Sequence, residues 1–231
     1  MSFLSVNFSS ESNALESFNR IANELANNII LKINDAKYRI VDCEFYAYSP
    51  VLPDPHTYKH SLQLQQGKLY LHGSGIDITC GNGESYGGIL LRSVVRLYNG
   101  SDSSTGFMQA QFDGPQIVAT ELLSNLNTLT DGGKNEIVLE DIQGQNQTAS
   151  FYGAKRVLKT KRVGLTPKKD DPDNHYLNLS LRYITVLPKF SNSSKFKQTI
   201  KGIETILREH VAEGLMTKEE AQDIVGYQLK F

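Results

Sequence analysis

Two carboxylates and two aromatic rings alternate along one predicted strand, and these residue types could activate water beside a flat ring. Side chains of a strand alternate between its faces. In the run 37–48 this places Asp42, Glu44, Tyr46 and Tyr48 together. The opposite face is apolar and consists of Val41, Cys43, Phe45 and Ala47. The polar face could line a pocket for a planar ligand, or it could be a solvent-facing acidic edge with surface tyrosines.

Arg92 is a cation that could pair with one of these carboxylates. It lies inside the strongly apolar run 89–97. A charge in such a run needs a partner or an opening to water. Glu44 could act as a general base on a water molecule that the Arg92 guanidinium helps to orient. The alternative is a structural ion pair between the same two residues.

Several residues of metal-ligand type lie between positions 54 and 80, namely Asp54, His56, His60, His72 and Cys80. The spacing of His56 and His60 would suit one helix face, but Pro50, Pro53 and Pro55 make this segment a loop. No recognised zinc motif accompanies them. We therefore expect no metal, and interpret the histidines as ring-stacking, hydrogen-bonding or surface groups.

A basic segment covers residues 154–169 and carries seven of the 24 basic residues and none of the 25 acidic ones. Such a segment on an otherwise acidic chain is suited to phosphate contacts. The alternative is a solvated basic hairpin. The basic residues are Lys155, Arg156, Lys159, Lys161, Arg162, Lys168 and Lys169.

Composition narrows the class of protein. The 231 residues suit one domain, and a net charge of −1 argues against a surface that is basic all over. Two cysteines provide no disulfide framework, and no signal peptide or membrane-spanning run is present, so we expect a cytoplasmic protein with no membrane partner. In a bacterium it would be nucleoid-associated, and in a eukaryote nuclear. No phosphate-binding glycine loop or serine nucleophile elbow occurs.

Periodicity predicts mixed helices and strands. The long loop at 49–66 is the largest irregular segment, and such loops often carry function. We expect helices at 11–28, after Gly114-Pro115, at 194–212 and after Thr217. We expect strands at 31–33, 37–48, 68–72, 76–80, 89–97, 137–139, 148–152, 156–165 and 176–185.

Six segments, in this order, resemble the alkyladenine (3-methyladenine) DNA glycosylase family over residues 11–187. The resemblance is carried by Ile40-Val41-Asp42-Cys43-Glu44-Phe45-Tyr46, Gly67-Lys68-Leu69-Tyr70-Leu71-His72, Ile89-Leu90-Leu91-Arg92-Ser93, Gly114-Pro115, Arg162-Val163-Gly164 and Leu181-Arg182-Tyr183. It implies one α+β domain, a curved antiparallel sheet with surrounding helices. We expect residues 1–187 to form it and residues 188–231 to be a helical extension packed on the same domain.

The resemblance also implies an enzyme of base excision repair that hydrolyses the N-glycosidic bond of an alkylated base. Glu44 would deprotonate water, and Arg92 would help to hold that water. Tyr46, His56 and His72 would surround a flipped-out base, and Asn82 would match a pocket-gating asparagine. No cofactor is implied. The basic residues Lys155, Arg156, Lys159, Lys161 and Arg162 would contact nucleic acid.

One departure from the family bears on the substrate. The family's hairpin tip carries a bulky side chain that wedges into the duplex, whereas this tip reads Gly73-Ser74-Gly75. Flipping a base out of a duplex costs a few kcal/mol. Damaged DNA that is single-stranded, or a free nucleoside, would be the easier ligand. The alternatives are a non-catalytic nucleic-acid or nucleobase binder with the same fold, and an oligomeric interaction protein that associates through residues 188–231.

Overall fold

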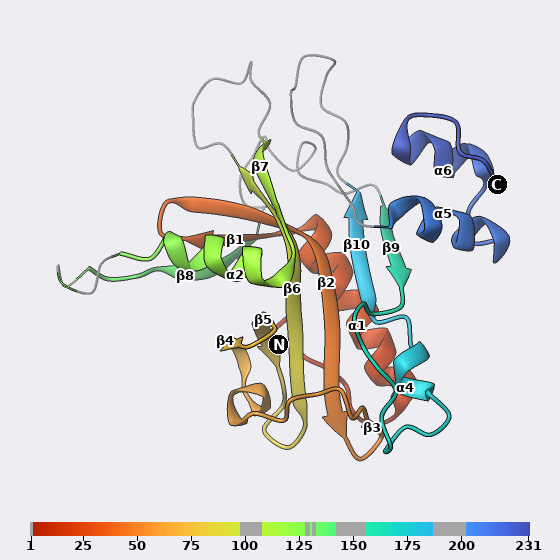
Figure 1. Ribbon diagram of the computed structural model, residues 1–231. Helices are drawn as coiled ribbons and strands as arrows, with labels where there is room; N and C mark the ends of the chain where they lie inside the picture. The colour runs from red at the N-terminus through yellow and green to blue at the C-terminus, as the bar shows by residue number, and fades with distance from the viewer. Residues whose placement is uncertain (1, 98–107, 128–129, 131–132, 142–155, 187–201) are drawn as a thin grey trace. The chain divides into compact units, whose positions relative to one another are not determined.

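A computed structural model gives the architecture, and it describes residues 2–97, 108–127, 130, 133–141, 156–186 and 202–231. The fold is α+β, as predicted, with a strongly curled antiparallel sheet (Figure 1). The chain divides into two compact units, Met1–Lys197 and Gln198–Phe231. Each unit is described by itself.

The sheet is built around one long strand, β2 (Ala36–Ser49). It forms a hairpin with β1 (Ile29–Ile33) through a turn at Asn34, whose positive φ of 50° suits asparagine. Along its length β2 also pairs with β3 (Leu52–Pro53), β6 (Tyr86–Leu97) and β10 (Arg182–Val186). All of these pairings are antiparallel, and the middle of β2 lies between β6 on one side and β10 on the other.

The remaining strands extend this centre. The sheet order is β4-β5-β6-β2-β1-β8, and β7 and β9 pair with β6 and β10. The predicted hairpin at residues 68–80 is confirmed as β4 and β5. The bounds are β4 (Gln66–His72), β5 (Gly75–Cys80), β7 (Met108–Asp113), β8 (Ile137–Asp141) and β9 (Arg156–Thr160).

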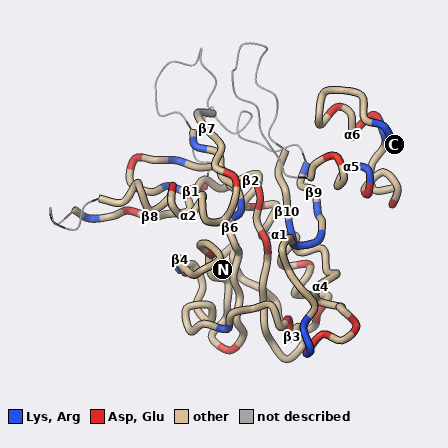
Figure 2. The backbone as a smooth tube through the Cα atoms, in the orientation of Figure 1, with Lys and Arg blue, Asp and Glu red and all other residues tan. Residues whose placement is uncertain are grey.

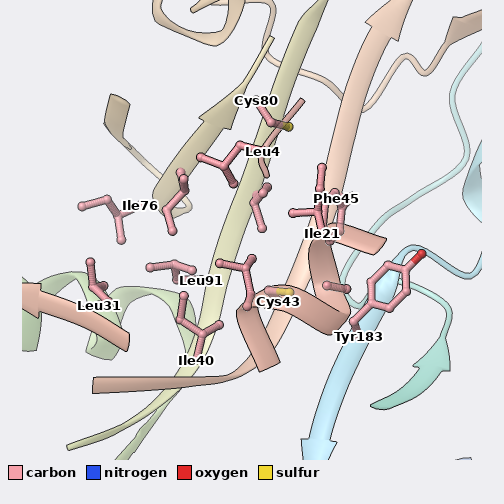
Figure 3. Close-up of a cluster of buried hydrophobic side chains, with 14 of the residues drawn as sticks. Leu4, Ile21, Leu31, Ile40, Cys43, Phe45, Ile76, Cys80, Leu91 and Tyr183 are labelled. Carbon is pink, nitrogen blue, oxygen red and sulfur yellow. The ribbon is translucent and has the colours of Figure 1, made fainter. Parts of the chain in front are cut away.

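The apolar face of β2 forms the core with helix α1 (Glu11–Asn27). Ser10 caps this helix by accepting a hydrogen bond from the backbone N–H of Asn13. The Phe18 ring of α1 lies 4.9 Å from the Phe45 ring of β2, centroid to centroid. Figure 3 shows Cys43 and Phe45 directed into this cluster with Tyr183 of β10. Burial on this side leaves the other face of β2 for the polar residues.

Helix α2 (Pro115–Ser124) packs against β5 and β6 through Val118, Ala119 and Leu122. It starts with proline at its first position, as the Gly114-Pro115 pair predicts. Its first turn lies close to the hairpin, because a Cβ added at Gly75 would be 2.8 Å from the Pro115 Cβ. Gly75 therefore permits the helix to approach the strand.

Three sequence expectations need correction. The predicted strand 176–185 is a helical turn, α4 (His175–Asn178), followed by the shorter β10, because Asp171 and Asn174 accept backbone hydrogen bonds that start the turn. The basic strand stops at Thr160 instead of residue 165. The loop 49–66 contains β3 and a 3-10 helix, Ser61–Leu64. The expected strand 148–152 and residues 194–201 of the expected helix lie outside the described residues.

The C-terminal unit contains α5 (Ile203–Ala212) and α6 (Lys218–Val225). The helix predicted after Thr217 is confirmed, and it starts with a capping box: the side chains of Thr217 and Glu220 each accept a hydrogen bond from the backbone N–H of the other residue. The packing of this unit on residues 1–187 stays a prediction. Within the described residues, no helix has the length and apolar character needed to cross a membrane.

Candidate functional site

Glu44 lies at the centre of the polar face of β2 and is completely buried, with 0% of its side chain exposed. Its Oε2 accepts a hydrogen bond from the Tyr46 hydroxyl at 2.8 Å, and its Oε1 accepts one from the backbone N–H of Val163 at 2.8 Å. Arg92 of β6 brings Nη1 to 3.3 Å from Oε1. The predicted contact between Glu44 and Arg92 therefore exists, and Val163 joins it from a third segment.

A second carboxylate and a second guanidinium complete a charge cluster of Asp42, Glu44, Arg92 and Arg182. Arg182 of β10 holds Asp42 with two nitrogens, Nε at 3.0 Å from Oδ1 and Nη2 at 2.6 Å from Oδ2. Arg92 Nε lies 3.7 Å from the same carboxylate. Figure 2 shows acidic segments of β2 beside basic segments of its neighbours. The cluster carries two positive and two negative charges, so its formal charge balances.

Burial raises the pKa of both carboxyl groups above their ordinary values. For Glu44, desolvation outweighs the opposing influence of Arg92 and of the hydrogen bonds from Val163 and Tyr46. For Asp42, desolvation outweighs Arg182 and Arg92. A carboxylate with a raised pKa binds a proton more readily than in water, which is the property that a general base near neutral pH needs.

Tyr46 is held by a second buried ion pair. The Arg162 guanidinium lies 4.6 Å from the centre of the Tyr46 ring, and its Nη1 is 2.5 Å from Asp54 Oδ2. It also donates to the backbone oxygens of Phe45 and Tyr176. Arg162 and Asp54 are both fully buried, so Arg162 has a structural position instead of the expected phosphate contact.

His56 and Asn82 have local surroundings of their own. The backbone N–H of His56 donates to Asp54, its buried Nε2 has no hydrogen-bond partner among the described residues, and burial lowers its pKa. Asn82 Oδ1 accepts hydrogen bonds from the backbone N–H groups of Glu84 and Ser85 in a turn. Asn82 also lines a groove of about 880 Å³ beside the N-terminal segment, whose lining residues do not include Glu44 or Arg92.

His72 belongs to a row of four rings, here called the ring stack: Tyr58, His72, Tyr70 and His60, in spatial order. Successive centroids are 4.8, 4.9 and 4.5 Å apart; the first two ring pairs are tilted by 55° and 36°, and the last pair, Tyr70 and His60, is stacked at 8°. His72 Nδ1 accepts the backbone N–H of Ser74, so Nε2 carries the proton and donates to Asp77 Oδ1 at 2.9 Å. The structure thus places His72 in a polar network separate from the contacts of Glu44.

The expected nucleic-acid residues do not form one exposed strip. Lys159 is half-buried above the Tyr183 ring at 5.7 Å, and burial lowers its pKa. Lys161 donates to Asn178 Oδ1 at 3.0 Å and remains exposed. Arg156 lies on β9, and Lys155 is outside the described residues. No group of three His, Cys, Asp or Glu residues within the described ranges is placed to hold a metal.

Sequence reasoning missed Asp77, the cluster position of Arg182 and the pairing of Asp54 with Arg162. Asp77 lies between Ile76 and Ile78. An acidic residue between apolar strand residues could have indicated a buried carboxylate that needs a partner. Arg182 faces Glu44 in the strand register, yet only the fold reveals that register. Asp54 had no comparable signal, because it lies in a proline-rich loop far from Arg162 in sequence.

Gly88→Ala is expected to lower the free energy of unfolding by about 1–3 kcal/mol through overpacking. An added Cβ would lie 2.5 Å from Asp77 Oδ2 and 2.7 Å from Gln63 Nε2, both of which are buried. Urea denaturation would measure the change. Gly73→Ala is the matched control, since nothing lies within 4 Å of its added Cβ; an equal loss in both variants would contradict the packing argument.

Comparisons with known proteins identify one distant relative. No protein-family model matches the chain. An uncharacterized protein of Acanthamoeba polyphaga mimivirus is 25% identical over 221 residues, which span 83% of this chain and 92% of that protein. The similarity covers most of both chains and carries no functional information.

Proposed function

We propose that this protein hydrolyses the N-glycosidic bond of a damaged, alkylated base in nucleic acid, with Glu44 as the general base. The observation that supports this proposal is the convergence of Glu44, Arg92 and Val163. They come from three segments of the chain, and each belongs to a motif that resembles the alkyladenine DNA glycosylase family. The curved antiparallel sheet that the resemblance implies also agrees with the fold.

In this reaction a water oxygen bonds to the anomeric carbon of the sugar while the carbon–nitrogen bond breaks. Glu44 takes a proton from the water, and the electrons of the broken bond leave with the base. An alkylated base that carries a positive charge leaves as a neutral molecule and needs no acid. Arg92 would orient the water, since its guanidinium contacts Glu44 and its side chain is 12% exposed.

Access to Glu44 requires one local movement. The Tyr46 hydroxyl donates a hydrogen bond to Glu44 Oε2, and the backbone N–H of Val163 donates one to Glu44 Oε1. A small shift of the Tyr46 side chain would draw its hydroxyl away from Oε2 and make room for water at that oxygen, while Val163 still fixes the other oxygen. The Arg162 guanidinium against the Tyr46 ring would then keep the ring in place to contact a base.

The test is release of free base from three labelled substrates: alkylated single-stranded DNA, alkylated duplex and alkylated nucleosides. The proposal expects release from at least one substrate, with loss of that release in Glu44→Gln. Absence of release from all three substrates by a folded protein would overturn it. Chromatography of the released base gives the readout.

The rate of base release is expected to rise with pH, with a midpoint above the ordinary glutamate value of about 4.3. The reason is that only ionised Glu44 accepts a proton from water, and burial raises its pKa. The same shift lowers the free energy of unfolding as pH rises from the ordinary value through the raised one, because the folded state then binds more protons. Single-turnover rates across this range provide the measurement, and a midpoint at or below the ordinary value would count against Glu44 as the base.

A second candidate function is a nucleic-acid or nucleobase binder that lacks catalysis. Complete burial of Glu44, with both carboxylate oxygens hydrogen-bonded, favours this candidate. In that case Glu44 would serve only as the counter-charge of the Arg92 guanidinium. Binding without base release, unchanged in Glu44→Gln, would identify it.

A further inference from the structure

We infer that the ring stack is a base-stacking surface for single-stranded nucleic acid, and that an oligonucleotide, rather than a nucleoside, is the preferred ligand. The inference rests on the proposed function for the choice of nucleic acid. Its physical evidence is the exposure, rigidity and charge of the segment 55–76, none of which the hydrolytic site uses.

The two ends of the ring stack are open to solvent. Tyr58 is 55% exposed, and His60 at the opposite end is also exposed. Of the inner rings, Tyr70 is partly buried, and the His72 side chain is only 6% exposed. Nucleobases stack on open aromatic rings independently of their sequence, since every base has a flat face.

The chain adopts an unusual backbone conformation to build this row. Tyr58 and His60 contact the same strand, β4, while Lys59 between them has a positive φ of 57°. A residue other than glycine, asparagine or aspartate seldom takes this conformation, which costs on the order of 1 kcal/mol or more. Lys59 thereby points elsewhere, and its Nζ lies 3.6 Å from the centre of the Tyr48 ring.

Hydrogen bonds hold the ring stack in place before any ligand binds. The backbone N–H of His60 donates to Gln63 Oε1, and Gln63 Nε2 donates to Asp77 Oδ2. Asp77 is buried, and its other oxygen accepts a hydrogen bond from His72 Nε2. The Tyr58 hydroxyl and Ser74 Oγ are 2.7 Å apart, which ties the outer ring to the hairpin tip. A preorganised surface loses little entropy on binding.

Charge favours a phosphate backbone over other partners. Residues 55–76 contain Lys59, Lys68 and three histidines, and no aspartate or glutamate. Both lysines are exposed. Lys59 is directed to the Tyr48 ring, whereas Lys68 lies on β4, the strand that carries Tyr70 and His72. A cation on the same strand as stacking rings is a combination that non-specific single-strand binding uses.

The distance between the ring stack and Glu44 favours an oligonucleotide over a nucleoside as the ligand. Directly paired residues share a face of the sheet, and the pairings run from Glu44 through Leu90 and Asp77 to Tyr70. Three strand spacings separate the ends of this row, roughly 14 Å for a flat sheet. One nucleoside is too short to span that distance, whereas neighbouring nucleotides of one oligonucleotide are long enough. The small hairpin tip at Gly73 and Ser74 offers no bulky side chain to open a duplex.

The test is fluorescence anisotropy with a labelled oligodeoxythymidylate of about 12 nucleotides, a length within the usual range of single-strand sites. Tyr58→Ala should bind roughly 5- to 100-fold more weakly than the full-length wild type, the loss expected for one stacked base. Tyr58→Phe keeps the ring and loses only the hydroxyl contact with Ser74, so it should bind clearly more tightly than Tyr58→Ala. Tyr227→Ala removes a comparably exposed tyrosine of the C-terminal unit and should bind like wild type.

Wild-type affinity in Tyr58→Ala, or equal losses in Tyr58→Ala and Tyr58→Phe, would overturn the inference, as would competition by free thymidine at the concentration of the oligonucleotide. The binding result is independent of catalysis. If the oligonucleotide binds as expected but no substrate releases base, only the proposed function is contradicted. If Tyr58→Ala releases base from single strands at the wild-type rate, only the binding role of the ring stack is contradicted.

Discussion

Glu44→Gln should lower the rate of base release by roughly 100- to 10,000-fold, the contribution of a positioned general base. Glutamine has nearly the same shape but does not take a proton from water. Its carbonyl oxygen can still accept the Val163 N–H, and its amide can donate to the Tyr46 oxygen. We therefore expect the fold to persist while the chemistry is lost.

Two measurements separate this result from unfolding. Circular dichroism of Glu44→Gln should resemble that of wild type, and urea denaturation should still show a cooperative transition, with a moderate loss of stability because Arg92 keeps only Asp42 as its counter-charge. Glu84→Gln changes an exposed carboxylate and should leave base release unchanged. Full activity in Glu44→Gln would remove Glu44 from the mechanism.

Asp54→Asn should lower the free energy of unfolding by about 3–5 kcal/mol, because it leaves the fully buried Arg162 without its counter-charge. For a protein of this size that loss corresponds to a fall in melting temperature of roughly 6–20 °C. Arg162 would also lose part of its hold on the Tyr46 ring. Calorimetry or thermal circular dichroism provides the measurement.

An exposed ion pair provides the contrast. Glu136→Gln breaks the pair with Lys32, in which Glu136 is 59% exposed, and should cost at most about 1 kcal/mol. The double variant Asp54→Leu with Arg162→Leu should be less destabilised than Asp54→Asn, since no charge remains buried. Equal effects of Asp54→Asn and Glu136→Gln would contradict a strong role for burial.

The sequence was most informative where a single strand determines the arrangement. Alternation along β2 predicted Cys43, Phe45 and Ala47 on its apolar face and Glu44 and Tyr46 on its polar face. Val41 was also expected on the apolar face, but a register irregularity at 40–43 places Ile40 in the core cluster instead. Arg92 was also predictable as the partner of Glu44, because a charge in an apolar strand must be compensated. These inferences need only the two-residue period of a strand and the cost of burying charge.

Inferences failed where a contact joins distant segments or depends on one backbone angle. Arg162 looked like part of a basic surface, but Asp54 lies in another segment and removes it from solvent. The assembly of Tyr58 and His60 on β4 depends on the φ of Lys59, for which lysine gives no signal. Residues 176–178 looked like a strand, and local hydrogen bonds to Asn174 and Asp171 make them helical instead.

The late position of β10 in the chain has a consequence for folding. Asp42 and Arg182 are 140 residues apart in sequence, so the middle of β2 lacks its second neighbour until the distant segment arrives. Contacts between distant segments form slowly. During that interval Asp42 and Glu44 are charged groups on an open strand edge, and such charges discourage pairing with other chains. The carboxylates that line the proposed site would therefore also protect the unfinished sheet from aggregation.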